Sequence, residues 1–238
     1  MTAEARAWAT SAKPERMLEL YPPGNDRKGR LLLVACCRAC WDFLAEGSQQ
    51  AVAIGERWTD GLADARKLED VCNLADYASV SADERYQEIG NDLRMVEVAW
   101  RGGPVGLRLR QLQGEHERQT KVLHAAMAAH AAVSQRPDAG DFRRAVQLLD
   151  PQLAVELLRD IFGNPFRPVT FSPLWRTDNA VSLAHTIDES REFGAMPILA
   201  DALQDAGCDS ADILDHCRNA SLTHVRGCWV VDLVLGKQ

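Results

Sequence analysis

The feature that most constrains the fold is the series of helix start and stop signals that runs along almost the whole chain. In "NDRKGRLLLVACCRACWDFL", Asn25 or Asp26 can cap a helix in which apolar residues recur at helical spacing. "SADERYQEIGNDLRMVEVAW" opens with the capping-box pair Ser81 and Glu84, which predicts a helix that begins there and runs to about Trp100. Alternating patterns typical of strands are nearly missing. The sequence therefore predicts an all-α protein, built as a multi-helix bundle or an irregular helical array.

Proline and glycine divide this helical pattern into parts. "RGGPVG", residues 101–106, predicts a loop because two glycines and a proline do not continue a helix cheaply. "LDPQLAVELLRDIF" restarts a helix, with Asp150 as its cap and Pro151 at the first helical position. "FGNPFRPVTFSP" follows and predicts an extended connector. We therefore expect an N-terminal helical region over 1–160, a connector over 161–176 and a C-terminal helical unit over 177–238.

The C-terminal unit carries the most regular signals. Thr177 or Asp178 can start one helix, and Pro197 fits the first turn of the next. Gly207 ends that second helix in the left-handed conformation that glycine tolerates. "HVRGCWVVDLVL" predicts a final helix that ends at Gly236. The pattern indicates a helical subdomain at the C-terminus.

Composition and charge exclude several classes of partner. The chain has 238 residues, of which 46% are hydrophobic, so it can bury a full core. Its 27 Lys and Arg against 34 Asp and Glu give a formal net charge of −7, which disfavours nucleic acid and anionic lipid. The first residues lack a signal-peptide pattern, and no apolar run approaches the ~20 residues of a membrane span. We expect a cytoplasmic protein with no nucleic-acid or membrane partner, and its seven scattered cysteines are expected to be reduced thiols.

A metal site is one interpretation of "HCRNASLTHVRGCW", residues 216–229. His224 and Cys228 lie four residues apart, on one face of the predicted last helix, and Cys217 lies across the preceding turn. Zinc prefers four such ligands. Cys208 would be the fourth, but it lies about 13 Å from Cys217 if the helix between them is regular, which is too far for both to bind one ion. The side chain of His216 points about 100° away from that of Cys217, so His216 can join the ligand set only where the helix frays. The alternative, which we favour here, is that these cysteines fill the core. Zinc is the one cofactor that the pattern allows.

The stretch "CCRAC" contains a C-x-x-C spacing at Cys37 and Cys40, next to Cys36. A thioredoxin-type site would place the first cysteine at a helix N-terminus after a strand. Here the upstream cap places these cysteines in the middle of a helix, which favours core packing. A composite site that joins them to His224 or Cys228 stays open.

The connector is the candidate binding surface of the chain. Aromatic side chains around an extended backbone are typical both of binding surfaces and of tight seams between domains. We expect an ordered, docked segment. Its candidate contact residues are Phe162, Phe166, Arg167, Phe171 and Trp175.

Several segments together suggest a family. "IFGNPFRPV", "PILADALQDAGCD", "ILDHCR" and "HVRGCWVVDLVLGK", with "DRKGRLLLVACCRACW" near the start, resemble an uncharacterised family that is expanded in planctomycete bacteria. The C-terminal match covers about 160–237, and roughly 45–145 match only as alanine-rich helix. "PILADALQDAG" also resembles the core of the short repeat-companion domains found in the same bacteria. Neither resemblance brings a known reaction, and the many paralogous copies of such families imply interaction or regulation.

Two classes of function follow from these patterns. The first is a non-enzymatic helical module that binds another protein or regulates it, since no catalytic residue set is recognised in the sequence. The second is a metal- or thiol-dependent protein that uses the Cys36/Cys37/Cys40 cluster and the Cys217/His224/Cys228 cluster. The sequence predicts no oligomeric state.

Overall fold

The computed structural model describes residues 1–99 and 106–237. These residues form twelve α-helices and three short 3-10 helices, with no β-strand among them, which confirms the predicted all-α fold. The predicted loop at 101–106 falls outside the described residues, apart from Gly106, which begins a helix. No helix in the described ranges combines the length and the apolar character that a membrane span requires.

The chain forms two compact units. Unit 1 combines Met1–Ala35 with Asp150–Gln238, and unit 2 comprises Cys36–Leu149. This division differs from the boundaries expected from the sequence, because the N-terminal helices and the connector both belong to unit 1. Helix α8 packs against α2 and against α12, so segments from the two ends of the chain close a single unit. Residues 163–177 contain no α-helix, but proline content does not reveal which helices the connector joins.

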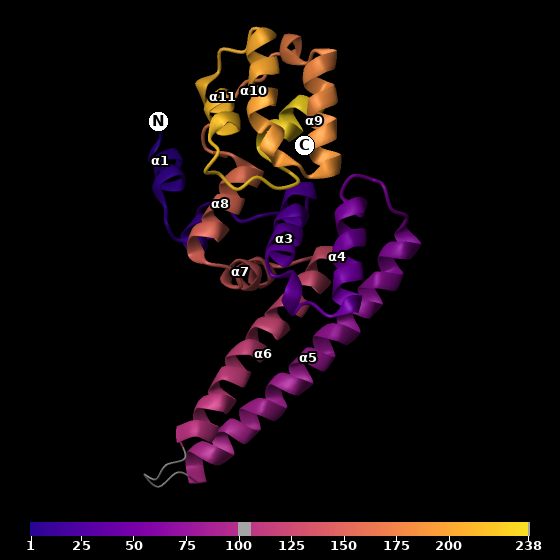
Figure 1. Ribbon diagram of the computed structural model, residues 1–238, viewed down its shortest axis with the longest axis vertical. Helices are drawn as coiled ribbons and strands as arrows, with labels where there is room; N and C mark the ends of the chain where they lie inside the picture. Colours follow the sequence, from indigo (N-terminus) through magenta and orange to yellow (C-terminus); the bar gives the residue numbers. More distant parts are fainter. Residues whose placement is uncertain (100–105, 238) are drawn as a thin grey trace. The chain divides into compact units, whose positions relative to one another are not determined.

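Unit 1 is the helical body that carries the candidate site. Its four C-terminal helices pack on one another around a core of alanine, leucine, valine and cysteine side chains (Figure 1). Its α-helices are α1 (Ala3–Thr10), α2 (Pro14–Leu20), the first part of α3 (Arg27–Ala39), α8 (Pro151–Phe162), α9 (Asp178–Ser190), α10 (Met196–Asp205), α11 (Ala211–Arg218) and α12 (Trp229–Leu235). The 3-10 helices η2 (Pro173–Trp175) and η3 (Phe193–Ala195) complete it.

Most helix ends of unit 1 follow the predicted local chemistry. The Asp26 carboxylate accepts from the amide of Gly29, and the Asp150 carboxylate accepts from the amide of Gln152. Thr177 caps α9 through its side chain, and Gly207 lies at φ +88° just beyond α10. These predictions are confirmed because each depends only on residues within one helical turn.

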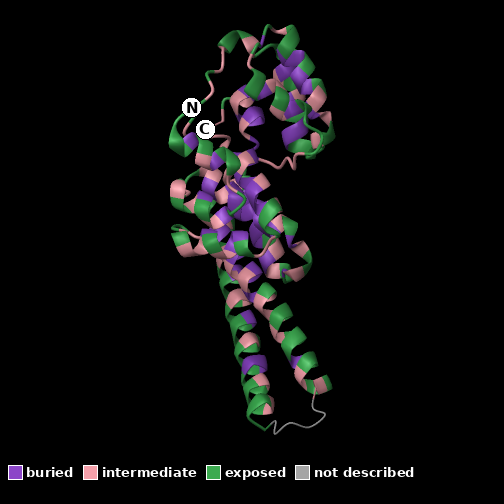
Figure 2. Cartoon of the chain, turned by 90° about the vertical axis from the view of Figure 1, so that its left-hand side faces the viewer, coloured by how far each residue is buried: buried purple, intermediate pink, exposed green. Residues whose placement is uncertain are grey.

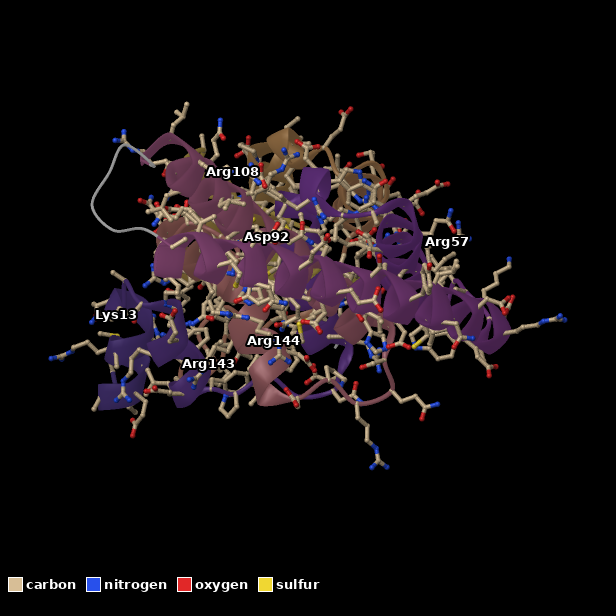
Figure 3. The ribbon with its side chains drawn as sticks, turned by 90° about the horizontal axis from the view of Figure 1, so that it is seen from below. Lys13, Arg57, Asp92, Arg108, Arg143 and Arg144 are labelled. Atoms are coloured by element: carbon tan, nitrogen blue, oxygen red, sulfur yellow. The ribbon has the colours of Figure 1, made fainter. Side chains whose placement is uncertain are left out.

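Unit 2 is built on a long helical hairpin. Helices α5 (Ala65–Ala99) and α6 (Gly106–Val133) run side by side (Figure 1), and α4 (Glu46–Trp58) packs against both. The remaining elements are η1 (Trp41–Phe43) and α7 (Ala139–Gln147). Buried residues are sparse over 76–99 of α5 and 106–122 of α6 (Figure 2), whereas they are dense over 123–133 of α6. Charged side chains such as Asp92 of α5 and Arg108 of α6 extend from the hairpin (Figure 3).

The predicted helix start at Ser81 is wrong. Helix α5 is continuous through this point, and Ser81 and Glu84 lie in its interior. Its buried residues Val71, Ala75, Ala82 and Ile89 recur every four or seven positions, which is the spacing of a helix packed along one seam. Packing along that seam favours one uninterrupted helix over a local cap.

Candidate metal centre

The segment that precedes the last helix is a loop, and this corrects the predicted helix around His224. Helix α12 begins at Trp229, so His224 and Cys228 do not share a helical face. The amide of Val225 donates to Asp160 Oδ2 at 2.8 Å, and the Thr223 hydroxyl donates to Glu156 Oε2 at 2.7 Å. These contacts with α8 hold the loop and take the Val225 amide away from helical hydrogen bonding.

Four side chains of unit 1 nevertheless converge on one point. His224 Nδ1 lies 2.7 Å from Asp160 Oδ1, and His216 Nε2 lies 3.2 Å from the same oxygen. Cys228 Sγ lies 3.2 Å from His216 Nε2 and 3.9 Å from His224 Nδ1. All four donor atoms lie within 4.8 Å of one another. The group can therefore hold a metal ion.

Each donor comes from a different structural element. Asp160 stands in the last turn of α8, and His216 in the last turn of α11. His224 lies in the loop, and Cys228 is the residue that precedes α12. The turn that closes the loop is held by the hydrogen bond from the Cys228 amide to the Val225 carbonyl, at 3.0 Å. The convergence is thus a tertiary arrangement of four segments.

Asp160 is the residue that fixes this arrangement, and its side chain is only 2% exposed. Burial by itself raises the pKa of Asp160, but the hydrogen bonds and charges of His216 and His224 outweigh it, so the pKa lies below its ordinary value. Because Oδ2 accepts from the loop amide, Oδ1 is the oxygen directed at the other three donors. The aspartate is therefore held in a monodentate orientation.

Cys228 closes the group from the side of the core. It is fully buried, and burial together with the charge of Asp160 raises the pKa of its thiol well above the ordinary value. The two histidine side chains are also largely enclosed, with 11% of His216 and 6% of His224 exposed. His224 Nε2 is buried and has no hydrogen-bond partner among the described residues. The donor set is therefore shielded from bulk water.

The remaining candidate cysteines lie outside the converging group. Cys208 and Cys217 belong to the apolar core of unit 1, and burial raises the pKa of the Cys217 thiol to about 12. Cys37 and Cys40 belong to unit 2, where both are buried near the end of α3. Burial raises the pKa of the Cys40 thiol to about 11. These four cysteines have the surroundings of packing residues.

The connector aromatics split into two groups within unit 1. Phe166 packs edge-on against Trp8 and Tyr21, and Phe162 packs against Tyr21. Phe171 packs edge-on against Trp175, at a ring separation of 5.3 Å. In addition, Arg167 pairs with Asp212 of α11 at 2.8 Å. The segment docks on neighbouring helices of its own unit.

Asp160 was the functional candidate that sequence reasoning missed. It lies three residues after Leu157 in "LAVELLRDIF", so the helical repeat already places it on the face that carries buried Leu157 and Ile161. An acid on an apolar helix face is expected to have a partner, because an unpaired buried charge is costly. That signal points to a partner without saying where along the chain the partner lies.

Comparison of the chain with models of protein families, with curated proteins and with solved structures found no match.

Proposed function

We propose that unit 1 is a metal-dependent helical binding module in which Asp160, His216, His224 and Cys228 hold one structural zinc ion. The single observation that carries this proposal is the convergence of one donor atom from each residue within 4.8 Å. Zinc–nitrogen, zinc–oxygen and zinc–sulfur bonds of about 2.0–2.3 Å imply donor separations of about 3.3–3.8 Å in a regular tetrahedron. Four donor pairs lie 2.7 to 3.9 Å apart, around that range, and the remaining pairs stay within 4.8 Å.

The same atoms argue against a cysteine-protease-like relay. In such a relay the histidine uses one ring nitrogen for the thiol and the other for the carboxylate. Here His216 Nε2 faces both Cys228 Sγ and Asp160 Oδ1, each at 3.2 Å. A single nitrogen that faces both partners fits convergence on a shared ion. The full burial of Cys228 also opposes a nucleophilic role, because a nucleophilic thiol must reach its substrate.

Charge balance supports a divalent ion at this point. A carboxylate and a thiolate supply two negative charges, and two neutral imidazoles supply none, so the complex with Zn²⁺ is neutral. A neutral complex is far less costly to bury than an isolated charge. The mixture of nitrogen, oxygen and sulfur donors in four positions is also typical of zinc.

Four protein donors leave no open coordination position, which favours a structural role. The ion would tie α8, α11, the loop and the start of α12 together, and its binding energy would count as folding energy. The proposed role of the site is therefore to hold the loop that covers α8. In this scheme the chain is a binding module rather than an enzyme.

Cobalt substitution tests the proposal. The metal-free protein, loaded with Co²⁺, is expected to bind one equivalent and to give the visible bands of tetrahedral cobalt with a thiolate-to-cobalt charge-transfer band. Cys228→Ser is expected to lose the charge-transfer band. Cys217→Ser is the matched control, because it changes an equally buried cysteine of the same unit and is expected to keep both features. Weak octahedral bands, or the same spectrum from both variants, would contradict the proposal.

Protein interaction through the α5–α6 hairpin is a second candidate function. Large apolar side chains lie exposed there, with Tyr77 at 76%, Met95 at 72%, Val98 at 83% and Leu107 at 73%. Met95 and Val98 lie three residues apart on α5, on neighbouring turns of one face, and exposed apolar side chains that gather on a surface mark interaction sites. We expect the full chain to retain a protein from the native lysate. The triple variant Met95→Ser, Val98→Ser and Leu107→Ser is expected not to retain it. Equal retention by both proteins would remove this candidate.

A further inference from the structure

Unit 1 also contains a cavity that shares one residue, His216, with the candidate metal centre. Its volume is about 660 Å³, and it lies among α1, α3, α8, the connector, α11 and α12. His216 and Trp229, whose rings lie 5.1 Å apart, form part of its wall. The volume is large enough for a small organic molecule of one or two rings.

Aromatic rings give the cavity flat, apolar walls. Trp8, Tyr21, Phe162 and Trp229 all line it. Trp8 and Tyr21 meet edge-on at 6.1 Å, and the Trp8 indole nitrogen donates to the Gly163 carbonyl at 2.6 Å. Trp229 lies against the Gly163 backbone, where an added Cβ would stand 3.2 Å from its ring. The rings are held in place before any ligand arrives, which lowers the entropic cost of binding.

The side chains that line the cavity carry a net positive charge, whereas the protein as a whole carries a net negative charge. Lys28, Arg159, Arg167 and Lys237 line the cavity, with two acids, Asp212 and Asp232. The formal sum is therefore four positive charges less two, or +2, in a chain whose net charge is −7. Both acids are already paired: Asp212 with Arg167 at 2.8 Å, and Asp232 with Arg27 at 2.6 Å.

In the described part of the chain, neither Lys28 nor Arg159 forms a direct ion pair with an acid, although the charge of Asp232 acts on Lys28 and that of Glu156 acts on Arg159. The Lys28 ammonium donates to the Ile161 carbonyl at 2.9 Å, which uses one of its three donors. Arg159 donates to the carbonyls of Trp8 and Ser11, and its buried Nε has no hydrogen-bond partner among the described residues. Burial lowers the pKa of Lys28 by more than the charge of Asp232 raises it, so the ammonium is held at a cost that a bound anion would relieve.

We infer that this cavity binds a small planar aromatic carboxylate. The flat body would lie between the aromatic walls, and the carboxylate would accept from the remaining donors of Lys28, with Arg159 adding to the positive field. A neutral ligand of the same shape would leave the lysine without a direct ion pair. The inference rests on Lys28 and the aromatic walls, and not on a bound metal.

A matched pair of probes tests this inference. Calorimetric titration of the full chain with 2-naphthoate is expected to give binding at least about tenfold tighter than with 2-naphthamide, the gain of one charge-assisted hydrogen bond. Lys28→Gln can keep the hydrogen bond to the Ile161 carbonyl while it removes the charge, and it is expected to abolish the preference. Lys28→Arg is expected to restore it. Lys13→Gln, at an exposed position of the same unit, is the control and is expected to leave both affinities unchanged.

Three outcomes would overturn the inference. The first is that neither probe binds, and the second is that both bind equally. The third is that Lys28→Gln keeps the preference for the acid. A thermal melt of each variant shows whether it is folded. If Lys28→Gln is unfolded, the comparison of Lys28→Arg with the parent chain decides, and loss of naphthoate binding in a folded Lys28→Arg protein would also count against it.

Discussion

His224 Nδ1 lies 2.7 Å from Asp160 Oδ1, although 64 positions separate the two residues along the chain. The second oxygen of the same carboxylate accepts from the Val225 amide at 2.8 Å. One aspartate therefore both orients the loop and contributes a donor to the candidate metal centre. Because the pair joins α8 to the C-terminal loop, changes to the Asp160–His224 contact or to its metal ligation are expected to change the stability of unit 1.

Removing the charge of Asp160 is expected to weaken zinc binding at least ~100-fold, since loss of an outer-shell partner alone typically costs 10- to 100-fold. Asp160→Asn keeps an oxygen that can accept from the Val225 amide, so the loop can stay in place. Competition with a chromophoric chelator gives the zinc affinity. Asp205→Asn, at an exposed position of α10 in the same unit, is the control and is expected to bind zinc like the parent chain. Equal affinities of the two variants would exclude Asp160 as a ligand.

The buried cysteines outside the metal centre are expected to contribute to packing alone. Cys37→Ser and Cys40→Ser place a hydroxyl where the structure offers an apolar setting, and each is expected to cost about 1–3 kcal/mol of unfolding free energy. Urea unfolding measures the loss, and metal analysis is expected to give unchanged zinc content. Unchanged stability of both variants would mean that these thiols are not packed in a core. Lost zinc would connect them to the metal centre.

Gly163 is expected to be the less replaceable of two left-handed glycines. It lies at φ +61°, and an added Cβ would stand 3.2 Å from two atoms of the Trp229 ring. Gly207 lies at φ +88° with nothing within 4 Å of an added Cβ. Gly163→Ala is therefore expected to cost about 2–3 kcal/mol, and Gly207→Ala about 1 kcal/mol. Thermal melts compare the two, and a larger loss for Gly207→Ala would contradict the packing of Trp229 on the connector.

The lowered pKa of Lys28 makes a prediction about pH. Burial is the first cause of this shift, so the folded protein releases the proton of Lys28 below the ordinary value of 10.5. Between those two pKa values the unfolded chain binds more protons, and the stability of the parent chain rises with pH. The unfolding free energy of the parent chain, measured against Lys28→Gln, is therefore expected to increase as pH rises towards 10.5. A constant difference between the two proteins would mean that Lys28 is solvated in the folded state.

The parts of the fold that follow from the sequence are those set within one or two helical turns. Asp26, Asp150 and Gly207 mark helix ends correctly, because a cap depends on neighbouring amides and on local backbone conformation. Ser81 has the same signal inside α5, where packing along the α5–α6 seam overrides it.

Only part of the candidate site could be predicted from the sequence. His216, His224 and Cys228 lie within one short stretch and are recognisable as donors. Their convergence depends on Asp160, which lies in another helix and draws the loop out of the helical pattern through the Val225 amide. Local patterns do not contain that long-range hydrogen bond.

X-ray absorption at the zinc edge of the zinc-loaded full chain tests the metal centre most directly, because it reports the number and type of atoms bound to the ion. One sulfur at about 2.3 Å and three nitrogen or oxygen atoms at about 2.0–2.2 Å are expected, from Cys228, His216, His224 and Asp160. A first shell with two or more sulfurs, a shell without sulfur, or a protein that retains no zinc after gel filtration would contradict the assignment.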